Sequence, residues 1–209
     1  SVTGVQTCAL PIWTTYEGEE DKYPFRIVTA GNMGVGKTSI INRLMSNEFT
    51  EEPPTINDLI VLNTVIRDRK AELTFDDTNG QELYRSITSS YYTGCNCVLV
   101  VYSQNDPDSA QSLSQILKDV ENYVNDKRVL IYIIRNKIDL DANIDENVLQ
   151  KIKKDKGYRF FSVSAKTGEG IDQLREDIKS TLYDTFIDTS KSKTKRKCRS
   201  EERRVGKEC

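Results

Sequence analysis

The chain has 209 residues, with 30 lysines and arginines against 32 aspartates and glutamates, so its formal net charge is -2. This length suits one domain with an ordinary hydrophobic core, and the balanced charge argues against a general DNA or RNA binder. There is no histidine, which excludes histidine-based acid–base chemistry and histidine metal ligation. The longest apolar runs are far shorter than the roughly 20 residues of a membrane-spanning helix, so we expect a soluble body.

The cysteines are Cys8, Cys95, Cys97, Cys198 and Cys209. They are odd in number and scattered, which does not fit a disulfide framework and favours a reducing compartment. Cys95 and Cys97 stand at the start of an apolar run. We interpret them as small buried side chains rather than as half of a metal site.

The two ends of the chain differ from the sequence beside them. We expect residues 1–12 and 199–209 to be artefactual or disordered flanks, and 13–22 to be an N-terminal extension. The folded domain is then 23–188. Residues 189–198 are polar and basic without an apolar partner, which predicts a flexible tail.

The first half of the domain predicts a strand, a helix and a hairpin. Phe25–Ala30 is a near-continuous apolar run, as in strands that helices cover on both faces. Ser39–Met45 opens a helical pattern. Ile60–Ile66 and Ala71–Phe75 are separated by a short charged stretch, which indicates an antiparallel hairpin.

The second half alternates further strands with helical patterns. Cys97–Tyr102 and Val129–Ile134 are again apolar runs, and Arg159–Val163 is a third strand. The alternation predicts an α/β fold of the P-loop type, with a mainly parallel six-stranded sheet, one antiparallel strand and helices on both faces. Apolar residues at helical spacing, which we interpret as core-facing, are Leu113, Ile116, Leu117, Val120 and Val124, then Ile171, Leu174, Ile178, Leu182 and Phe186.

Residues 31–38 read GNMGVGKT directly after the first predicted strand and match the phosphate-loop pattern G-x-x-x-x-G-K-[ST]. Glycines let such a loop wrap a phosphate closely, and the helix that follows adds its positive N-terminal end. Lys37 can reach the β- and γ-phosphates, and the Thr38 hydroxyl can ligate Mg²⁺. ATPases, kinases and GTPases all remain open at this point. The predicted phosphate-binding residues are Gly31, Gly34, Val35, Gly36, Lys37, Thr38 and Ser39.

Two later loops, each after a predicted strand, point to guanine. Residues 136–139 read NKID, and the Asp139 carboxylate can accept from both N1–H and the 2-amino group of guanine, a pair that adenine lacks. A polar site deprived of its partner discriminates by about 10⁴ to 10⁵, so GTP should be preferred to ATP. In residues 164–166 (SAK) a backbone N–H can meet the guanine oxygen. The predicted base-binding residues are Asn136, Lys137, Asp139, Ser164, Ala165 and Lys166.

Two further segments complete a recognisable set. Residues 77–82 (DTNGQE) follow the strand that ends at Phe75, and Thr55 lies in a proline-containing loop. In this order, over roughly residues 23–187, the motifs resemble those of the Ras superfamily of small GTPases.

The resemblance implies a role for each matching residue. Thr55 and Asp77 would bind Mg²⁺ together with the phosphate-loop threonine, and the Gly80 N–H would touch the γ-phosphate. Gln81 would orient the attacking water, with Thr55 and the phosphate-loop lysine as the other catalytic residues. Phe49 would pack against the guanine ring. A slow conversion of GTP to GDP and phosphate is the expected activity.

The branch of the superfamily is indicated by residues 84–92 (YRSITSSYY) and by the basic tail with Cys198, which look like those of Rab proteins. That resemblance implies vesicular membrane traffic, with an exchange factor, a GTPase-activating protein and effectors acting through residues near 49–60 and 77–93. A prenyl group on Cys198, added to the basic residues, would supply the two signals that durable anchoring needs. We therefore expect a cytoplasmic protein that attaches reversibly to the cytosolic face of endomembranes.

The chain also departs from the family pattern. Asn79 replaces the usual alanine, and Phe75-Asp76 replaces an apolar–tryptophan pair. Met33 stands where the family commonly has a compact residue beside the attacking water, so we expect slow intrinsic turnover and resistance to an arginine finger. Three alternatives stay open: a GTP-bound scaffold with negligible hydrolysis, a Ras- or Rho-like signalling GTPase, and an ATP-using P-loop enzyme.

Overall fold

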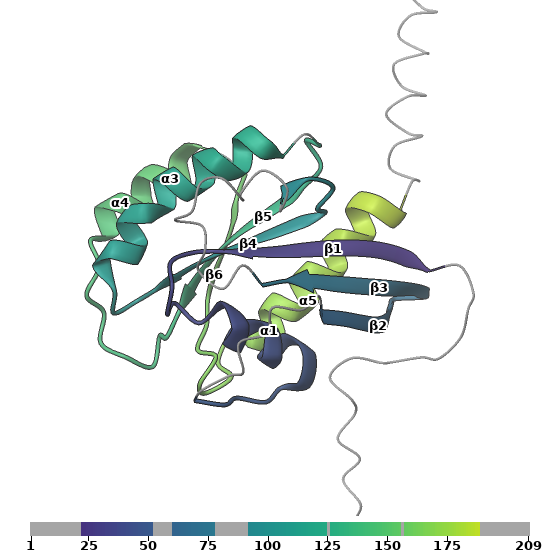
Figure 1. Cartoon of the computed structure of the whole chain (residues 1–209), viewed down its shortest axis with the longest axis horizontal. Helices are drawn as coiled ribbons and strands as arrows, with labels where there is room; N and C mark the ends of the chain where they lie inside the picture. Colours follow the sequence, from purple (N-terminus) through teal and green to yellow (C-terminus); the bar gives the residue numbers. More distant parts are fainter. Residues whose placement is uncertain (1–21, 52–59, 78–91, 125, 156, 189–209) are drawn as a thin grey trace, which may run out of the picture.

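The computed structural model of the chain describes residues 22–51, 60–77, 92–124, 126–155 and 157–188 (Figure 1). Its strands are β1 (Tyr23–Ala30), β2 (Ile60–Ile66), β3 (Arg69–Asp76), β4 (Cys97–Ser103), β5 (Leu130–Asn136) and β6 (Arg159–Ser162). Its helices are α1 (Lys37–Ser46), α3 (Pro107–Tyr123), α4 (Glu146–Asp155), α5 (Ile171–Leu182) and the π-helical turn η2 (Tyr183–Ile187).

The six strands form one sheet in the order β2-β3-β1-β4-β5-β6. The hairpin partners β2 and β3 are antiparallel, in register from Ile60 opposite Phe75 to Ile66 opposite Arg69. All other neighbouring strands are parallel. The predicted fold class, a mainly parallel sheet with one antiparallel strand, is confirmed.

Each central strand is buried on both faces because its side chains alternate between two hydrophobic clusters. In β4, Cys97 and Leu99 belong to the cluster beneath α1 and α5, while Val98 and Val100 belong to the cluster beneath α3 and α4. Figure 1 shows these two pairs of helices on opposite faces of the sheet. This double burial explains why the central strands are near-continuous apolar runs.

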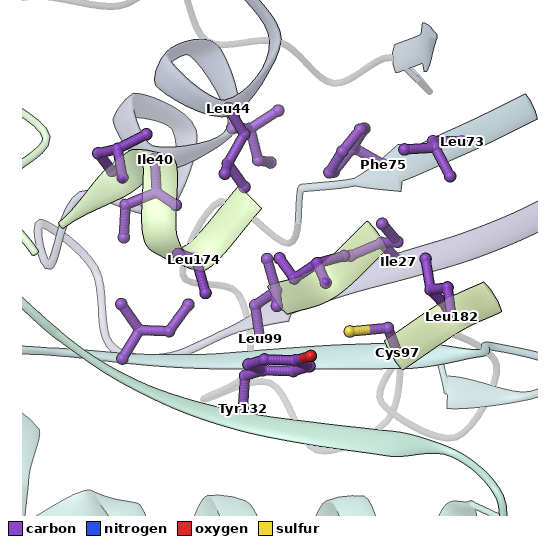
Figure 2. Close-up of a cluster of buried hydrophobic side chains, with 14 of the residues drawn as sticks. Ile27, Ile40, Leu44, Leu73, Phe75, Cys97, Leu99, Tyr132, Leu174 and Leu182 are labelled. Atoms are coloured by element: carbon purple, nitrogen blue, oxygen red, sulfur yellow. The ribbon is translucent and has the colours of Figure 1, made fainter. Parts of the chain in front are cut away.

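The close-up in Figure 2 shows the first of these clusters, with α1 and α5 side chains packed over the sheet. Ile40 and Leu44 come from α1, and Leu174 and Leu182 from α5, and all four are fully buried. Cys97 lies in this layer as a free, buried thiol, so its predicted role as a small core side chain is confirmed, as is that of Cys95.

Helix α4 is an element that the sequence analysis did not predict. Its apolar side chains Leu149 and Ile152 are buried and complete the second cluster against α3 and β5. They stand three residues apart among mostly polar neighbours, so the apolar stripe is too narrow to indicate a helix by itself. The helix α3 has a stronger signal, since the Asp106 side chain accepts from the amides of Asp108 and Ser109 and caps its start.

The described helices include none that is both long enough and apolar enough to cross a membrane. The parallel strands instead bring their C-terminal ends to one edge of the sheet. The loop after β1, the residue after β3, the end of β5 and the loop after β6 all carry predicted functional residues. An open α/β sheet places its ligand crevice at this edge.

Candidate nucleotide-binding site

A cleft of about 630 Å³ opens where these loops meet. Its volume falls within the range of roughly 300–1,000 Å³ that small-molecule sites occupy. Met33, Glu51 and Leu140 line it without having been predicted as binding residues. The predicted residues that the fold brings to its wall are Gly34, Gly36, Lys37, Thr38, Ser39, Phe49, Asn136, Lys137, Asp139, Ala165 and Lys166.

The phosphate loop has a backbone that only glycine adopts easily at key positions. Gly36 has φ +94°, and a Cβ at that position would collide with the side-chain amide nitrogen of Asn136. That nitrogen donates to the carbonyl of Val35 at 2.8 Å, so the loop is fixed to the end of β5. Gly31 and Val35 are themselves buried behind the cleft wall.

Lys37 begins α1 and is nearly buried, with 4% of its surface exposed. Its ammonium donates to the carbonyls of Gly31 at 2.7 Å and Asn32 at 3.0 Å, so it lies folded along the loop that it follows. A cation held at the floor of a cleft, at the N-terminus of a helix, attracts an anionic ligand.

Two of the predicted magnesium ligands lie against each other. The Thr38 hydroxyl donates to one carboxylate oxygen of Asp77, and the Thr29 hydroxyl donates to the other at 3.3 Å. Magnesium is usually held by one or two protein oxygens, with waters and substrate phosphates as the remaining ligands. The described residues contain no cluster of three or more acidic or thiol side chains that would form a self-sufficient cage. The hydroxyl–carboxylate pair therefore fits Mg²⁺ that arrives with a phosphate ligand.

The other half of the cleft carries the residues predicted to bind the base. Lys137 has φ +61° and donates its ammonium to the carbonyl of Gly34 at 2.7 Å, which joins this half to the phosphate loop. Asp139 is exposed to the cleft, and one of its carboxylate oxygens accepts from the Ser164 hydroxyl at 2.5 Å. Ser164 is itself buried and accepts from the amide of Thr167 at 3.0 Å. Ser164 thus lies behind the wall and holds the carboxylate in place.

The sequence analysis missed a residue that supports this half. Arg43, in the last turn of α1, donates from Nε to the carbonyl of Ala165 and from Nη2 to that of Lys166, both at 2.7 Å. A basic residue near a helix C-terminus is an ordinary feature. Its partners are more than 120 residues away in the sequence, so local patterns could not reveal them.

Four predicted functional residues lie outside the described residues. These are Thr55 in the proline-containing loop, Gly80 and Gln81 in the segment after β3, and Cys198 in the tail. Their roles stay predictions.

Comparison with known proteins agrees with this geometry. A protein-family model described as the Ras family matches residues 26–184. The GTP-binding protein YPT52 of Saccharomyces cerevisiae is 31% identical over 204 residues, covering 82% of this chain and 87% of its own. The Ras-related protein RABA2a of Arabidopsis thaliana is 32% identical, covering 79% and 77%. The human Ras-related protein Rab-30 is 31% identical, covering 78% and 82%. The chain therefore belongs to the Ras family of small GTPases, in its Rab branch.

Proposed function

We propose that the chain is a guanine-nucleotide switch that binds GTP and GDP with Mg²⁺, hydrolyses GTP slowly and regulates vesicular membrane traffic. The observation that carries this proposal is the shared cleft, in which a phosphate loop and a guanine-type base loop are joined by direct hydrogen bonds. Membership of the Ras family argues against an ATP-using P-loop enzyme.

The phosphates would lie along residues 31–39. Lys37 would turn its ammonium from the loop carbonyls to the β- and γ-phosphates, and the α1 N-terminus would add its positive end. Thr38 and Asp77 would hold Mg²⁺, which neutralises developing charge when bound. By family resemblance, Thr55 and Gly80 would contact the γ-phosphate side and Gln81 would orient the attacking water.

The base would lie between Phe49 and the loop after β6. Asp139 would accept from N1–H and the 2-amino group of guanine, with Ser164 fixing the carboxylate. The Ala165 amide already donates to the Asn136 side chain at 3.1 Å. The Lys166 amide donates to no residue in the described part of the chain, so we assign it to the guanine oxygen.

Nucleotide titration tests this assignment of base and metal. Full-length protein should bind GDP far more tightly than ADP, and chelation of Mg²⁺ should speed GDP release. Asp139→Asn should lose most of the preference for GDP over ADP, because the amide replaces one of the two acceptor oxygens by a donor and so cannot accept from both guanine donors. The control is Asp141→Asn, the same chemical change at an exposed position outside the cleft. Equal affinity for ADP and GDP in the unmodified chain would refute the proposal.

Met33 bears on the rate of hydrolysis. Met33 belongs to the phosphate loop, is 78% exposed and lines the cleft. By family resemblance, the attacking water and an incoming arginine would approach beside it. We propose that it slows intrinsic turnover and hinders an activating protein, whose arginine normally contributes about 10³ to 10⁵ in rate. Single-turnover hydrolysis by Met33→Gly, with and without an activating protein, should be faster than that of the unmodified chain. Identical rates in both conditions would remove this part of the proposal.

The same observation favours a second function, a GTP-bound scaffold with negligible catalysis. Phosphate release from preloaded protein separates the two, because a scaffold would retain GTP over many hours even with an activating protein.

The traffic role rests on the Rab branch. We propose that exchange factors, activating proteins and effectors bind residues near 49–60 and 77–93, and that a lipid on Cys198 attaches the protein reversibly to the cytosolic face of endomembranes. Mass analysis of the natural protein tests the attachment, and an unmodified Cys198 in membrane-bound material would contradict it.

A further inference from the structure

We propose that Arg43 is a positioning residue for base recognition: its guanidinium holds the loop after β6 so that the loop's free amide faces the guanine oxygen. This inference deepens the proposed function and rests on it. Arg43 itself does not line the cleft, so it would act only through the loop that it holds.

The contacts of Arg43 converge on the base half of the cleft. The guanidinium donates to the consecutive carbonyls of Ala165 and Lys166, both at 2.7 Å, and both residues line the cleft. The Ala165 carbonyl belongs to the peptide unit that joins Ala165 to Lys166. Bonds from one rigid planar group to this carbonyl and to the next one fix the orientation of that peptide unit. The amide of that peptide unit is the Lys166 N–H, the donor assigned to the guanine oxygen.

The same side chain also contacts the other wall of the base site. Its guanidinium carbon lies 5.9 Å from the centre of the Phe49 ring, within cation–π range, and Phe49 is the residue expected to pack against guanine. Its remaining nitrogen donates to the carbonyl of Asn47, the residue that caps α1. One guanidinium therefore links three groups: the end of α1, the aromatic wall and the loop after β6.

The backbone of Arg43 is fixed from the opposite side. Arg175 of α5 is buried, with 4% exposed, and donates to the carbonyls of Arg43 at 2.9 Å and Leu44 at 3.0 Å. The last turn of α1 is thus tied to α5, which limits the directions in which the Arg43 side chain can extend.

Two substitutions at Arg43 test the inference in the full chain. Arg43→Met keeps the apolar stem and removes all donors, and we expect GDP release to quicken on the order of tenfold, which corresponds to about 1.4 kcal/mol. Arg43→Lys keeps the charge but replaces the rigid planar guanidinium by a single ammonium on a flexible stem, so it should hold the loop less firmly and show a smaller change in the same direction. Single-turnover hydrolysis of preloaded GTP should change little, because within the described residues the Arg43 guanidinium donates only to the carbonyls of Asn47, Ala165 and Lys166, none of which belongs to the phosphate loop.

Base analogues separate positioning from general loosening. 6-Thioguanosine diphosphate offers a weak sulfur acceptor to the loop amide, and inosine diphosphate lacks only the 2-amino group that Asp139 reads. In Arg43→Met the affinity ratio of GDP to the thio analogue should fall toward one. The ratio of GDP to inosine diphosphate should stay unchanged, since Ser164 rather than Arg43 holds Asp139.

The matched control is Arg67→Met. Arg67 donates to Asp184 at 3.0 Å and Ser180 at 3.2 Å and lies 4.4 Å from the Tyr183 ring, a similar set of contacts away from the cleft. The Arg67→Met variant should release GDP at the same rate as the unmodified chain. Unmodified release by both folded Arg43 variants, or parallel changes in both analogue ratios, would overturn the inference. Failure of the unmodified chain to bind GDP would instead refute the proposed function.

Discussion

Removing Arg26 should destabilise the domain strongly, because it leaves a buried carboxylate without its counter-charge. The carboxylate belongs to Asp76 at the end of β3, is 7% exposed and accepts from both Nε and Nη2 of Arg26 in β1. Its other oxygen is buried without a partner among the described residues. Breaking a buried ion pair from one side typically costs about 3–5 kcal/mol. Because the Arg26 side chain is 31% exposed, we expect Arg26→Met to lower the unfolding free energy by about 3 kcal/mol.

The double variant Arg26→Met with Asp76→Leu should recover most of that loss, since apolar pairs of similar volume often replace buried ion pairs at little cost. Urea unfolding measures both, and unchanged denaturant slopes would show that the compared states are the same. GDP and Mg²⁺ must be kept at the same saturating excess over each variant's dissociation constant, because bound ligand adds to apparent stability. A loss below about 1 kcal/mol in Arg26→Met, or no recovery in the double variant, would refute the reasoning.

Three further outcomes are expected. Gly36→Ala should abolish tight GDP binding in a titration, because the new Cβ at φ +94° would collide with the Asn136 side chain that joins the two halves of the cleft. Gly170→Ala should lower the unfolding free energy in urea by more than about 1 kcal/mol, because at φ +74° its Cβ would meet the Ser162 carbonyl. Burial raises the pKa of Cys95 from 9.0 to about 11, so its thiol contributes stability that is present below pH 9 and lost as pH rises towards 11. Between pH 9 and pH 11, the unfolding free energy should therefore fall less steeply with pH in Cys95→Ala than in the unmodified chain.

Much of the fold was predictable because the central strands are buried on both faces. Cys97–Ser103 is fully buried, and such a strand reads as a near-continuous apolar run, broken here only by its last residue. Helix α4 escaped prediction because the two side chains that it is seen to add to the second cluster, Leu149 and Ile152, stand among mostly polar residues. The predicted apolar stripe near the end of the domain continues past Leu182, and its last residue, Phe186, lies in a π-helical turn rather than in α5.

The site was predictable where chemistry demands particular residues in consecutive positions. The phosphate loop and residues 136–139 are such segments, and the cleft unites them. The supports of these segments were not predictable. Arg43 was missed, and Ser164 was predicted to bind the base but not to hold Asp139. Both act through hydrogen bonds to atoms far along the chain, and any donor reaching the same place would serve.

The two halves of the cleft are held by different means, and this has a functional consequence. The phosphate half is fixed by its own glycine backbone and by Asn136 and Lys137. The base loop additionally depends on Arg43, whose backbone is held by Arg175 of α5. We therefore expect a perturbation that reaches the last turn of α1 or the facing side of α5 to loosen the loop after β6 without moving the phosphate loop. Under the proposed function, we therefore expect nucleotide release and GTP hydrolysis to be separable properties of this domain, since release would need the base contacts to yield while hydrolysis would depend on the phosphate side.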